Sequence, residues 1–313
     1  MKCAIFSCLG LGDGLIASVL GRNLKENGHE VVIFHPFLNQ VERWFPGISF
    51  RPFPPDLTEF DRYFVIYERS PWMQAVLDEC LSKFRAQTTV LNPIATPNTD
   101  YPFWEEGRFD GNKTFVENLY VFSRDILKLP HASDKSGLVI PSEITPRRFP
   151  QRVIIHPTSS RPGKNWSRHK FLRLAEKLKK GGFDPVFTVG PKEQAEWPEG
   201  KIFPSLDELF VFVAESGAMI GNDSGIGHLA SACGLPTLTL CRNQRTADFW
   251  HPYWAQSEVC LPSGWLPNIK GMRWRDEKWQ WGLSVRRVYS TFLSLANRST
   301  SERVDSVCGK KTS

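Results

Sequence analysis

The sequence predicts an α/β protein that carries two doubly wound parallel sheets in two domains. Short apolar segments alternate with amphipathic helical segments from residue 2 onward, and the series starts again after a proline-rich stretch at 141–150. The 313 residues, 41% hydrophobic and 23% charged, have an ordinary globular composition and suffice for two domains. We therefore expect domains at 1–145 and 146–296, followed by a disordered polar tail at 297–313.

In the first half, an apolar strand at 3–9 leads through the glycine-rich turn Gly10 to Gly14 into a helix at 15–27. The apolar residues of this helix recur at helical spacing, and Gly28 ends it. A strand at 31–34 completes a βαβ unit. Further strands are expected at 63–67 and 88–91, with a helix at 73–84 between them.

The second half repeats this order. A strand at 153–156 is followed by a polar turn and by an amphipathic helix at 171–180, which Gly181 and Gly182 end. The other expected strands lie at 185–189, 218–221 and 237–241, and the other helices at 206–215, 228–233 and 284–295. Two similar domains of this kind bind ligands at the carboxyl ends of their strands.

Composition excludes several classes. No stretch reaches the roughly 20 apolar residues of a membrane helix, and Asp13 interrupts the apolar run that a signal peptide would need. Seven cysteines without a CxxC pair indicate neither a disulfide framework nor a zinc site. We expect a cytoplasmic protein.

The charge is mildly basic, with a net charge of +6. Because there is no dense basic run, zinc-finger spacing or RNP-like motif, we expect no nucleic-acid partner. The basic pairs Arg147-Arg148, Lys179-Lys180 and Arg286-Arg287 are interpreted as solvated faces. An anionic small molecule, or peripheral contact with an acidic membrane surface, suits the same charge.

Residues 250–281 contain six of the 11 tryptophans. The favoured interpretation is a cluster that packs a long loop onto the domain. A platform facing a sugar or a lipid is the alternative.

The first candidate site is Gly10-Leu11-Gly12-Asp13-Gly14, between a strand and a helix. Leu15 stands where a dinucleotide fingerprint requires its third glycine, so we exclude an NAD site. Asp13 is either a helix N-cap or a general base.

The second candidate is the loop His156 to Ser160, which leads to Lys164. Hydroxyl and amide donors together with one cation suit a phosphate. A plain polar surface turn has the same composition.

The third candidate is the segment in which a buried strand runs into Asp223 and Ser224. The backbone amides of Gly225, Ile226 and Gly227 would lie in the first turn of the next helix, with His228 beside them. Amides at a helix N-terminus attract anions, and glycines let a diphosphate approach closely. The alternative makes Asp223 or Ser224 a cap and His228 a packing residue.

These motifs resemble glycosyltransferase family 9, the heptosyltransferases of lipopolysaccharide core synthesis. The segment Asp223 to Ala230 is similar to the family's Asp-Thr/Ser-Gly-x-x-His-Leu-Ala turn, Lys164-Asn165-Trp166 to its Lys-x-Trp, and Gly12-Asp13 to its catalytic Gly-Asp. The resemblance covers about residues 1 to 295. It implies a GT-B fold, in which two Rossmann-like domains face a central cleft and the second binds most of the donor.

The resemblance also implies roles for individual residues. Asp13 would deprotonate the acceptor hydroxyl. The donor would be held by residues of the second domain, namely Thr158, Ser159, Lys164, Glu193, Asp223, Ser224, Gly225, Ile226, Gly227 and His228. Among these, Glu193 would bind the ribose, although a solvent-facing glutamate explains it equally well.

The expected function is therefore an inverting transferase without metal or cofactor, because the chain has no Asp-x-Asp pair. By kinship, the partners would be a nucleotide-diphosphate sugar, ADP-heptose, and a lipid-linked core oligosaccharide at the inner face of the inner membrane. Three departures from the family pattern are Gly14, Gly227 and the segment Cys241 to Thr246. The alternatives are a nucleotide-sugar transferase or epimerase with another donor, a nucleotide-sugar hydrolase on the same fold, and a non-catalytic binding protein.

Overall fold

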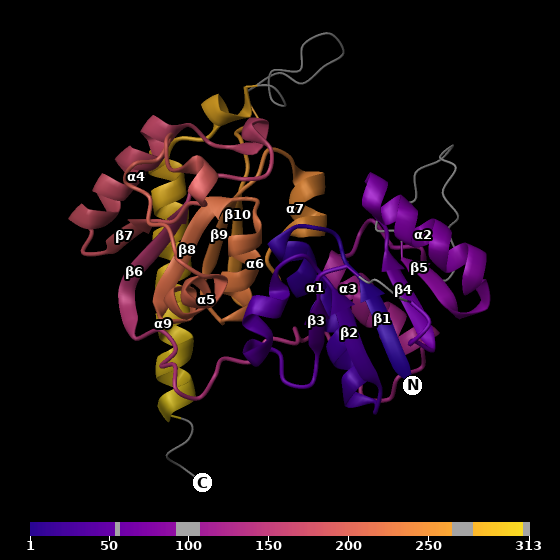
Figure 1. The fold of residues 1–313 in the computed structure, drawn as a ribbon. Helices are drawn as coiled ribbons and strands as arrows, with labels where there is room; N and C mark the ends of the chain where they lie inside the picture. The colour runs from indigo at the N-terminus through magenta and orange to yellow at the C-terminus, as the bar shows by residue number, and fades with distance from the viewer. Residues whose placement is uncertain (54–56, 92–106, 265–277, 309–313) are drawn as a thin grey trace. The chain divides into compact units, whose positions relative to one another are not determined.

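The computed structural model describes residues 1–53, 57–91, 107–264 and 278–308 (Figure 1). The chain divides into two compact units, Met1–Pro141 and Ser142–Ser313. The division falls four residues before the expected boundary at 145/146. Each unit is built on one five-stranded sheet with parallel pairing throughout.

The sheet of unit 1 has the order β3-β2-β1-β4-β5. Its strands are β1 (Lys2–Phe6), β2 (Glu30–Phe34), β3 (Ser49–Arg51), β4 (Arg62–Ile66) and β5 (Thr88–Leu91). Its helices are α1 (Leu11–Glu26), α2 (Pro71–Lys83) and α3 (Phe115–Val121), with the short segments η1 (Leu38–Trp44), η2 (Arg85–Gln87) and η4 (Phe122–Ile126). The strand order reverses between β1 and β4, where open α/β sheets bind ligands.

The sheet of unit 2 has the order β10-β9-β8-β6-β7. Its strands are β6 (Phe149–His156), β7 (Asp184–Phe187), β8 (Ser216–Asn222), β9 (Thr237–Leu240) and β10 (Ser257–Cys260). Its helices are α4 (Arg168–Lys180), α5 (Leu206–Ala214), α6 (Gly225–Ala232), α7 (Gln244–Trp250) and α9 (Val285–Cys308), with η5 (Pro162–Lys164), η6 (Pro191–Glu193) and η7 (Trp279–Gly282). Here the order reverses between β6 and β8.

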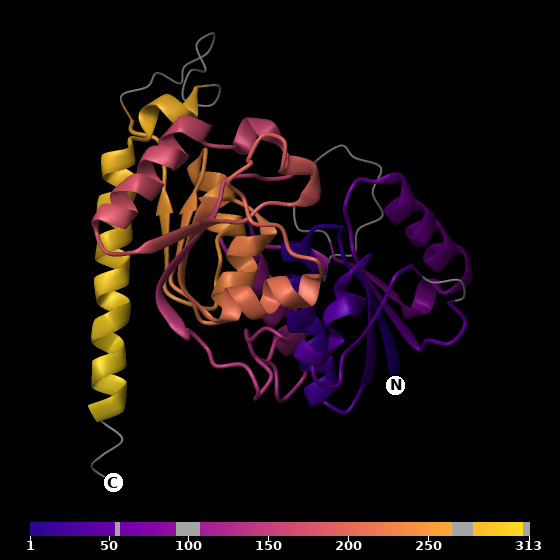
Figure 2. The same cartoon turned by 60° about the vertical axis from the view of Figure 1, so that its left-hand side comes forward.

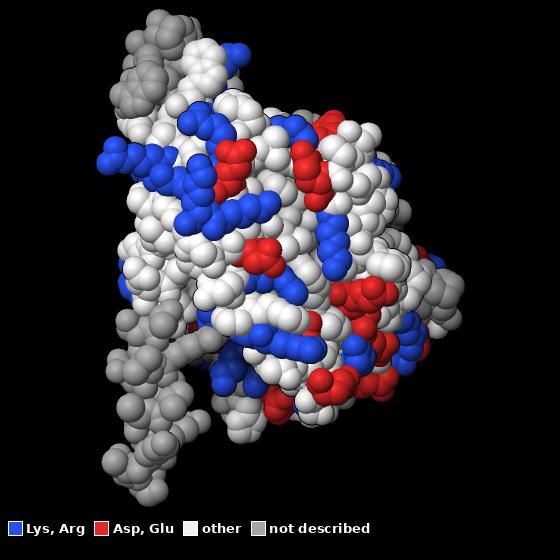
Figure 3. All heavy atoms as spheres, turned by 90° about the vertical axis from the view of Figure 1, so that its left-hand side faces the viewer, with Lys and Arg blue, Asp and Glu red and all other residues white. Residues whose placement is uncertain are grey.

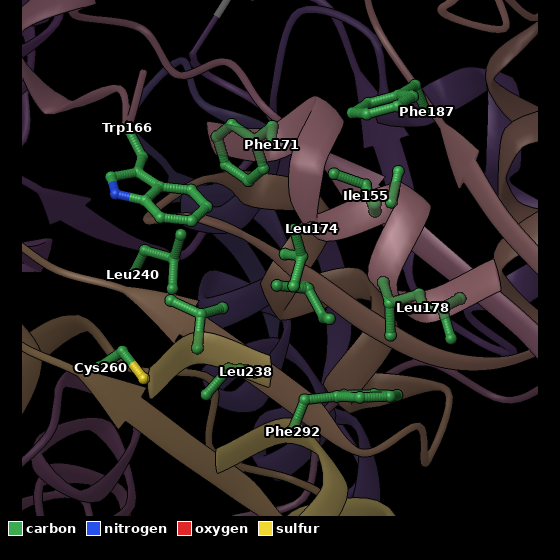
Figure 4. Close-up of a cluster of buried hydrophobic side chains, with 14 of the residues drawn as sticks. Ile155, Trp166, Phe171, Leu174, Leu178, Phe187, Leu238, Leu240, Cys260 and Phe292 are labelled. Atoms are coloured by element: carbon green, nitrogen blue, oxygen red, sulfur yellow. The ribbon is translucent and has the colours of Figure 1, made fainter. Parts of the chain in front are cut away.

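The core of unit 2 lies between the sheet and the helices α4 and α9. Phe171 and Leu174 of α4 and Phe292 of α9 are fully buried and pack on strand residues such as Leu238 (Figure 4). Figure 2 shows α9 in yellow along one side of the unit. The surfaces of these side chains are almost completely removed from water. This burial of apolar surface is the main contribution that holds the helices on the sheet.

Helix α1 begins at Leu11, four residues earlier than expected. The N–H of Gly10 donates to Asp13 Oδ2 at 3.2 Å, so the carboxylate satisfies the start of the helix from its third position. Gly12 and Gly14, which were expected in a turn, therefore lie inside the helix, and Gly10 is its N-cap.

Gly14 is explained by its neighbours. A Cβ at this position would lie 2.5 Å from Leu38 Cδ1 and 2.7 Å from His35 Cδ2. Because both side chains are fully buried and cannot withdraw, only glycine fits beside the His35 ring. The departure from the family pattern at position 14 thus accompanies a histidine at position 35.

Two expectations for the C-terminal part differ from the structure. The segment Cys241 to Thr246, expected to depart from the family pattern, is partly helical: α7 begins at Gln244, and the side chain of Asn243 caps it by accepting from the N–H of Thr246 at 2.9 Å. The tail expected from residue 297 continues α9 to Cys308, since no glycine or proline interrupts residues 285–308. No described helix combines the length and the hydropathy of a membrane span.

Candidate functional site

The carboxyl ends of β6 and β8 bring the second and third candidate segments of the sequence together. These strands pair in parallel, with His156 opposite Gly221. The loop after β6 contains Thr158 and Lys164, and the turn after β8 contains Asp223 and Ser224. The candidate site therefore occupies the point where the strand order of this sheet reverses.

Asn222, the last residue of β8, holds the two segments together. Its side chain is 1% exposed. Its Nδ2 donates to the carbonyl of Pro157 at 2.6 Å, and its Oδ1 accepts from the N–H of Trp166 at 3.0 Å. The residues that precede Thr158 and follow Lys164 are thus fixed to the same amide. Asn222 is not among the expected site residues, although an amide side chain at the end of a buried strand is a usable sequence signal.

Lys164 reaches the turn after β8. Its Nζ lies 2.8 Å from Asp223 Oδ2, and the two side chains are 35% and 14% exposed. The alternative of Asp223 as the helix cap does not hold, because Ser224 occupies the N-cap position of α6. Asp223 instead orients Lys164 at the edge of the site.

The first turn of α6 offers fewer amides than expected. Ser224 is extended, with φ −155° and ψ 163°, and its side chain makes no capping hydrogen bond. The N–H of Gly227 donates to the carbonyl of Ser224 at 3.1 Å, and a Cβ at Gly227 would lie 3.3 Å from Pro252 Cγ. Only Gly225 and Ile226 therefore keep the N–H groups that a helix start cannot pair internally.

Three buried polar atoms around this turn have no hydrogen-bond partner among the described residues. They are Thr158 Oγ1, Ser224 Oγ and His228 Nδ1. The Thr158 and His228 side chains are 3% and 5% exposed. Since buried polar groups in folded proteins are nearly always paired, three such atoms at one sheet edge indicate a site for a polar ligand.

His228 is neutral at neutral pH. Burial lowers its pKa to about 4, although nearby Asp223 acts in the opposite direction. A neutral imidazole presents one donor and one acceptor, so His228 can hydrogen-bond an anion without carrying a charge into the site.

Ser159 and Glu193 both make local contacts. The hydroxyl of Ser159 donates to Asn165 Oδ1 at 2.7 Å and lies 3.0 Å from the carbonyl of Arg161, so it closes its own loop. Glu193 is half-buried at the end of η6, and its Oε2 accepts from the N–H of Gly190 at 2.7 Å. The side chain is therefore not simply solvent-facing, and it stands beyond β7, the neighbour of β6.

Asp13 lies in unit 1, beyond the carboxyl end of β1. The carbonyl of Gly10, at the N-cap of α1, is held by His35, whose Nε2 lies 3.1 Å from it. Burial lowers the pKa of His35 to about 4. The neutral ring therefore fixes the turn on which Asp13 is mounted.

His35 should make the stability of the protein sensitive to acid. Its pKa is about 4 when folded and about 6.5 when unfolded, so the unfolded chain binds the proton more readily and stability falls as pH decreases through this window. The expected loss is about 3 kcal/mol between pH 6.5 and 4. Urea denaturation of His35→Gln should show a correspondingly smaller loss, because glutamine can still donate to Gly10.

The matched control is His131→Gln, at an exposed position of the same unit. This variant should retain the full loss of stability. Equal losses in wild type and His35→Gln would assign the acid sensitivity to other groups.

The tryptophan-rich segment 250–281 contains both a buried and an exposed tryptophan. Trp279 is fully buried, and its Nε1 donates to the carbonyl of Gly163 at 3.1 Å, which confirms the packing interpretation for this residue. Trp281 is 62% exposed. Trp250 and Trp254 are half-buried, and Trp265 and Trp274 lie outside the described residues.

Comparisons with known proteins point to one family. Residues 142–272 match the model of glycosyltransferase family 9 (heptosyltransferase). The chain is 29% identical over 139 residues to lipopolysaccharide heptosyltransferase 3 of Escherichia coli K12, an alignment that covers 40% of this chain and 39% of that protein. The matched part is thus well under half the length of this curated relative.

Solved structures share the fold of the whole chain. ADP-heptose lipopolysaccharide heptosyltransferase II of E. coli aligns with a TM-score of 0.66 at 17% identity, covering 96% of this chain and 100% of that one. An E. coli heptosyltransferase solved with ADP aligns at 0.63 and 13% identity, covering 94% and 100%. A family 9 protein from Veillonella parvula aligns at 0.62 and 15% identity, covering 95% and 97%.

The expected fold class is confirmed, since both units are doubly wound α/β sheets and the structural relatives have the same GT-B fold. The sequence match falls on unit 2, which contains the turn after β8 that first suggested the family. Residues 142–272 are therefore similar to glycosyltransferase family 9, and the chain as a whole shares the fold of solved heptosyltransferases.

Proposed function

We propose that this protein is an inverting, metal-independent glycosyltransferase that moves a heptose from ADP-heptose to the lipid-linked core oligosaccharide of lipopolysaccharide. It would act in the cytoplasm, at the inner face of the inner membrane. The observation that carries the proposal is the set of three unpartnered buried polar atoms around the first turn of α6, beside Lys164. The proposed donor and acceptor are taken from the names of the relatives, which mention ADP-heptose and lipopolysaccharide.

The chemistry of unit 2 suits a nucleoside diphosphate. The N–H groups of Gly225 and Ile226, the hydroxyls of Thr158 and Ser224 and the His228 imidazole would receive phosphate oxygens. Lys164 would add one cation, held in place by Asp223. Such fixed donors stabilise the charge that develops on a leaving diphosphate.

Asp13 would act as the general base toward the acceptor hydroxyl. Inversion requires one carboxylate on the side of the sugar opposite the leaving group, and no covalent intermediate. Glu193 would accept hydrogen bonds from the ribose hydroxyls through the oxygen that does not bind Gly190.

The first test is a thermal-shift titration with ADP, UDP, GDP and CDP, with and without EDTA. A ligand that binds the native state raises the melting temperature. We expect selective stabilisation by ADP that persists in EDTA. Stabilisation by UDP alone would refute the donor, and loss of the ADP effect in EDTA would refute metal independence.

Thr158→Val sharpens this test. The variant removes a buried hydroxyl without a described partner, so the melting temperature of the free protein should stay equal or rise. The affinity for ADP should fall about tenfold if the hydroxyl binds phosphate. Ser216→Ala is the control, because that buried hydroxyl donates to the carbonyl of Phe212 and its loss should lower stability alone.

An assay of heptose transfer distinguishes the proposed transferase from an epimerase or a hydrolase. Purified protein should consume ADP-heptose only when the acceptor is present, and the new linkage should have the anomeric configuration opposite to that of the donor. Turnover of the donor without acceptor would favour the hydrolase or epimerase. An absence of any nucleotide binding would favour a non-catalytic protein.

A further inference from the structure

One face of unit 2 is strongly basic. Helix α4 contains six Lys and Arg and one Glu. Its apolar side, with Phe171, Leu174 and Leu178, is buried on the sheet. Arg173, Lys177 and Lys180 recur at helical spacing and are exposed on the opposite side. Figure 3 shows the side of the molecule that carries α4, with Lys and Arg side chains gathered over part of it.

The basic side of α4 is joined to η7 and to the start of α9. Lys170 Nζ donates to the carbonyl of Leu283 at 3.0 Å and also to that of Gln280. Lys177 Nζ lies 4.9 Å from the centre of the Tyr289 ring on α9. Basic pairs that are far apart in the sequence, one on α4 and one on α9, therefore belong to two helices that pack together.

An exposed tryptophan borders these cations. Trp281 of η7 is 62% exposed, and Lys278 Nζ lies 5.9 Å from the centre of its ring. Arg286, three residues before Tyr289, is exposed on α9. We define the basic face as these residues together with those of α4: Arg173, Lys177, Lys180, Lys278, Trp281 and Arg286.

The cations of the basic face are not neutralised within the unit. None of its five Lys and Arg residues forms an ion pair with a carboxylate in the described part of the chain, whereas Arg168 and Arg298 nearby pair with Glu199 and Glu258. These five cations therefore have no close ion-pair partner among the described side chains, and Glu176 is the one carboxylate of α4 beside them.

We propose that the basic face docks the protein onto an anionic membrane surface. Long Lys and Arg side chains reach phosphate headgroups while their stems stay on the helix, and a tryptophan ring prefers the headgroup level. A single-stranded nucleic acid is less suited, because it requires successive aromatic rings for stacking, and the face presents one. The choice of a membrane rests on the proposed function, in which the acceptor is lipid-linked.

The test is co-sedimentation of the full chain with vesicles of phosphatidylcholine alone, or mixed with phosphatidylglycerol, at increasing salt. We expect binding to the anionic vesicles only, weakening with salt. Each basic residue near such a surface contributes roughly fivefold in affinity, so Arg173→Glu/Lys177→Glu/Lys180→Glu should reduce binding on the order of a hundredfold or more. Trp281→Ala should reduce it several-fold at every salt concentration.

The matched control reverses three exposed cations of unit 1, as Lys83→Glu/Lys113→Glu/Lys135→Glu, with the same change in net charge. This variant should bind anionic vesicles far better than the α4 variant. Equal loss in both variants, absence of vesicle binding by the wild type, or tighter binding to a single-stranded oligonucleotide would overturn the proposal.

The ADP thermal shift separates this inference from the proposed function. The α4 variant should retain the full ADP effect, because none of its three positions lies in the candidate site. Loss of vesicle binding with an intact ADP effect is the expected pattern. Vesicle binding without an ADP thermal shift would refute the proposed transferase, and the assignment of the basic face as a membrane-docking surface would still hold.

Discussion

Asp13→Asn is expected to lower kcat for heptose transfer by about two to four orders of magnitude, the usual contribution of a general base. An amide cannot take up the proton of the acceptor hydroxyl at neutral pH. Its oxygen can still accept from the N–H of Gly10, which Asp13 Oδ2 now does at 3.2 Å. The start of α1, the melting temperature and the ADP affinity should therefore stay unchanged.

Glu193→Gln is the matched control for this variant. Glu193 caps Gly190 as Asp13 caps Gly10, so both amides preserve the local backbone. A ribose contact predicts a higher KM for the donor with little change in kcat. If Asp13→Asn keeps the wild-type kcat, the carboxylate is a capping residue and the assigned base is wrong.

Asn222→Ala is expected to have the largest effect on unit 2. The substitution leaves the carbonyl of Pro157 and the N–H of Trp166 buried without their partner. Each such loss costs about 1 to 3 kcal/mol, so the free energy of unfolding should fall by roughly 2 to 5 kcal/mol. Affinity for ADP in the folded fraction should also fall, because the loop that carries Thr158 and Lys164 loses its anchor.

Asn118→Ala in unit 1 distinguishes the two effects. Asn118 is also buried, donates to the carbonyls of Asp110 and Thr114, and accepts from the N–H of Asp110. Its loss should destabilise unit 1 in urea denaturation without changing the ADP affinity of the folded protein. Equal ADP affinities in both variants would exclude Asn222 as the residue that positions the site.

Hydrophobic patterning predicted most of the fold. The largely buried strands β1, β2, β4 and β8 show as short apolar runs, and helices with one apolar side show as periodic segments. The edge strands β3 and β10 were not predicted, because each has three or four residues of which only one is buried, and so short a segment leaves no such pattern. Helix α3 had a usable signal in Thr114 and Glu117, a capping box that the structure contains.

The candidate site was less predictable than the fold. Residues with a chemical signature, such as Lys164 and His228, could be selected from sequence because phosphate binding limits the choice of side chains. The positions of His35 and Asn222 depend on contacts between distant segments, such as the ring of His35 against Gly10 and Gly14. No local pattern encodes such contacts. Ser159 shows the opposite case. Its hydroxyl has the right chemistry for a phosphate, but it donates to Asn165 within its own loop.

The separation of the two sheets along the chain has a consequence for biosynthesis. All five strands of the first sheet lie before residue 92, all five of the second begin after residue 148, and no described strand pairs across this division. The strands β2 and β6 contain the similar segments Val-Val-Ile-Phe and Val-Ile-Ile-His. Each of them could therefore pair with the strands that flank the other. Because a ribosome delivers the first set before it has made the second, the order of synthesis protects this chain from mispairing between its own sheets.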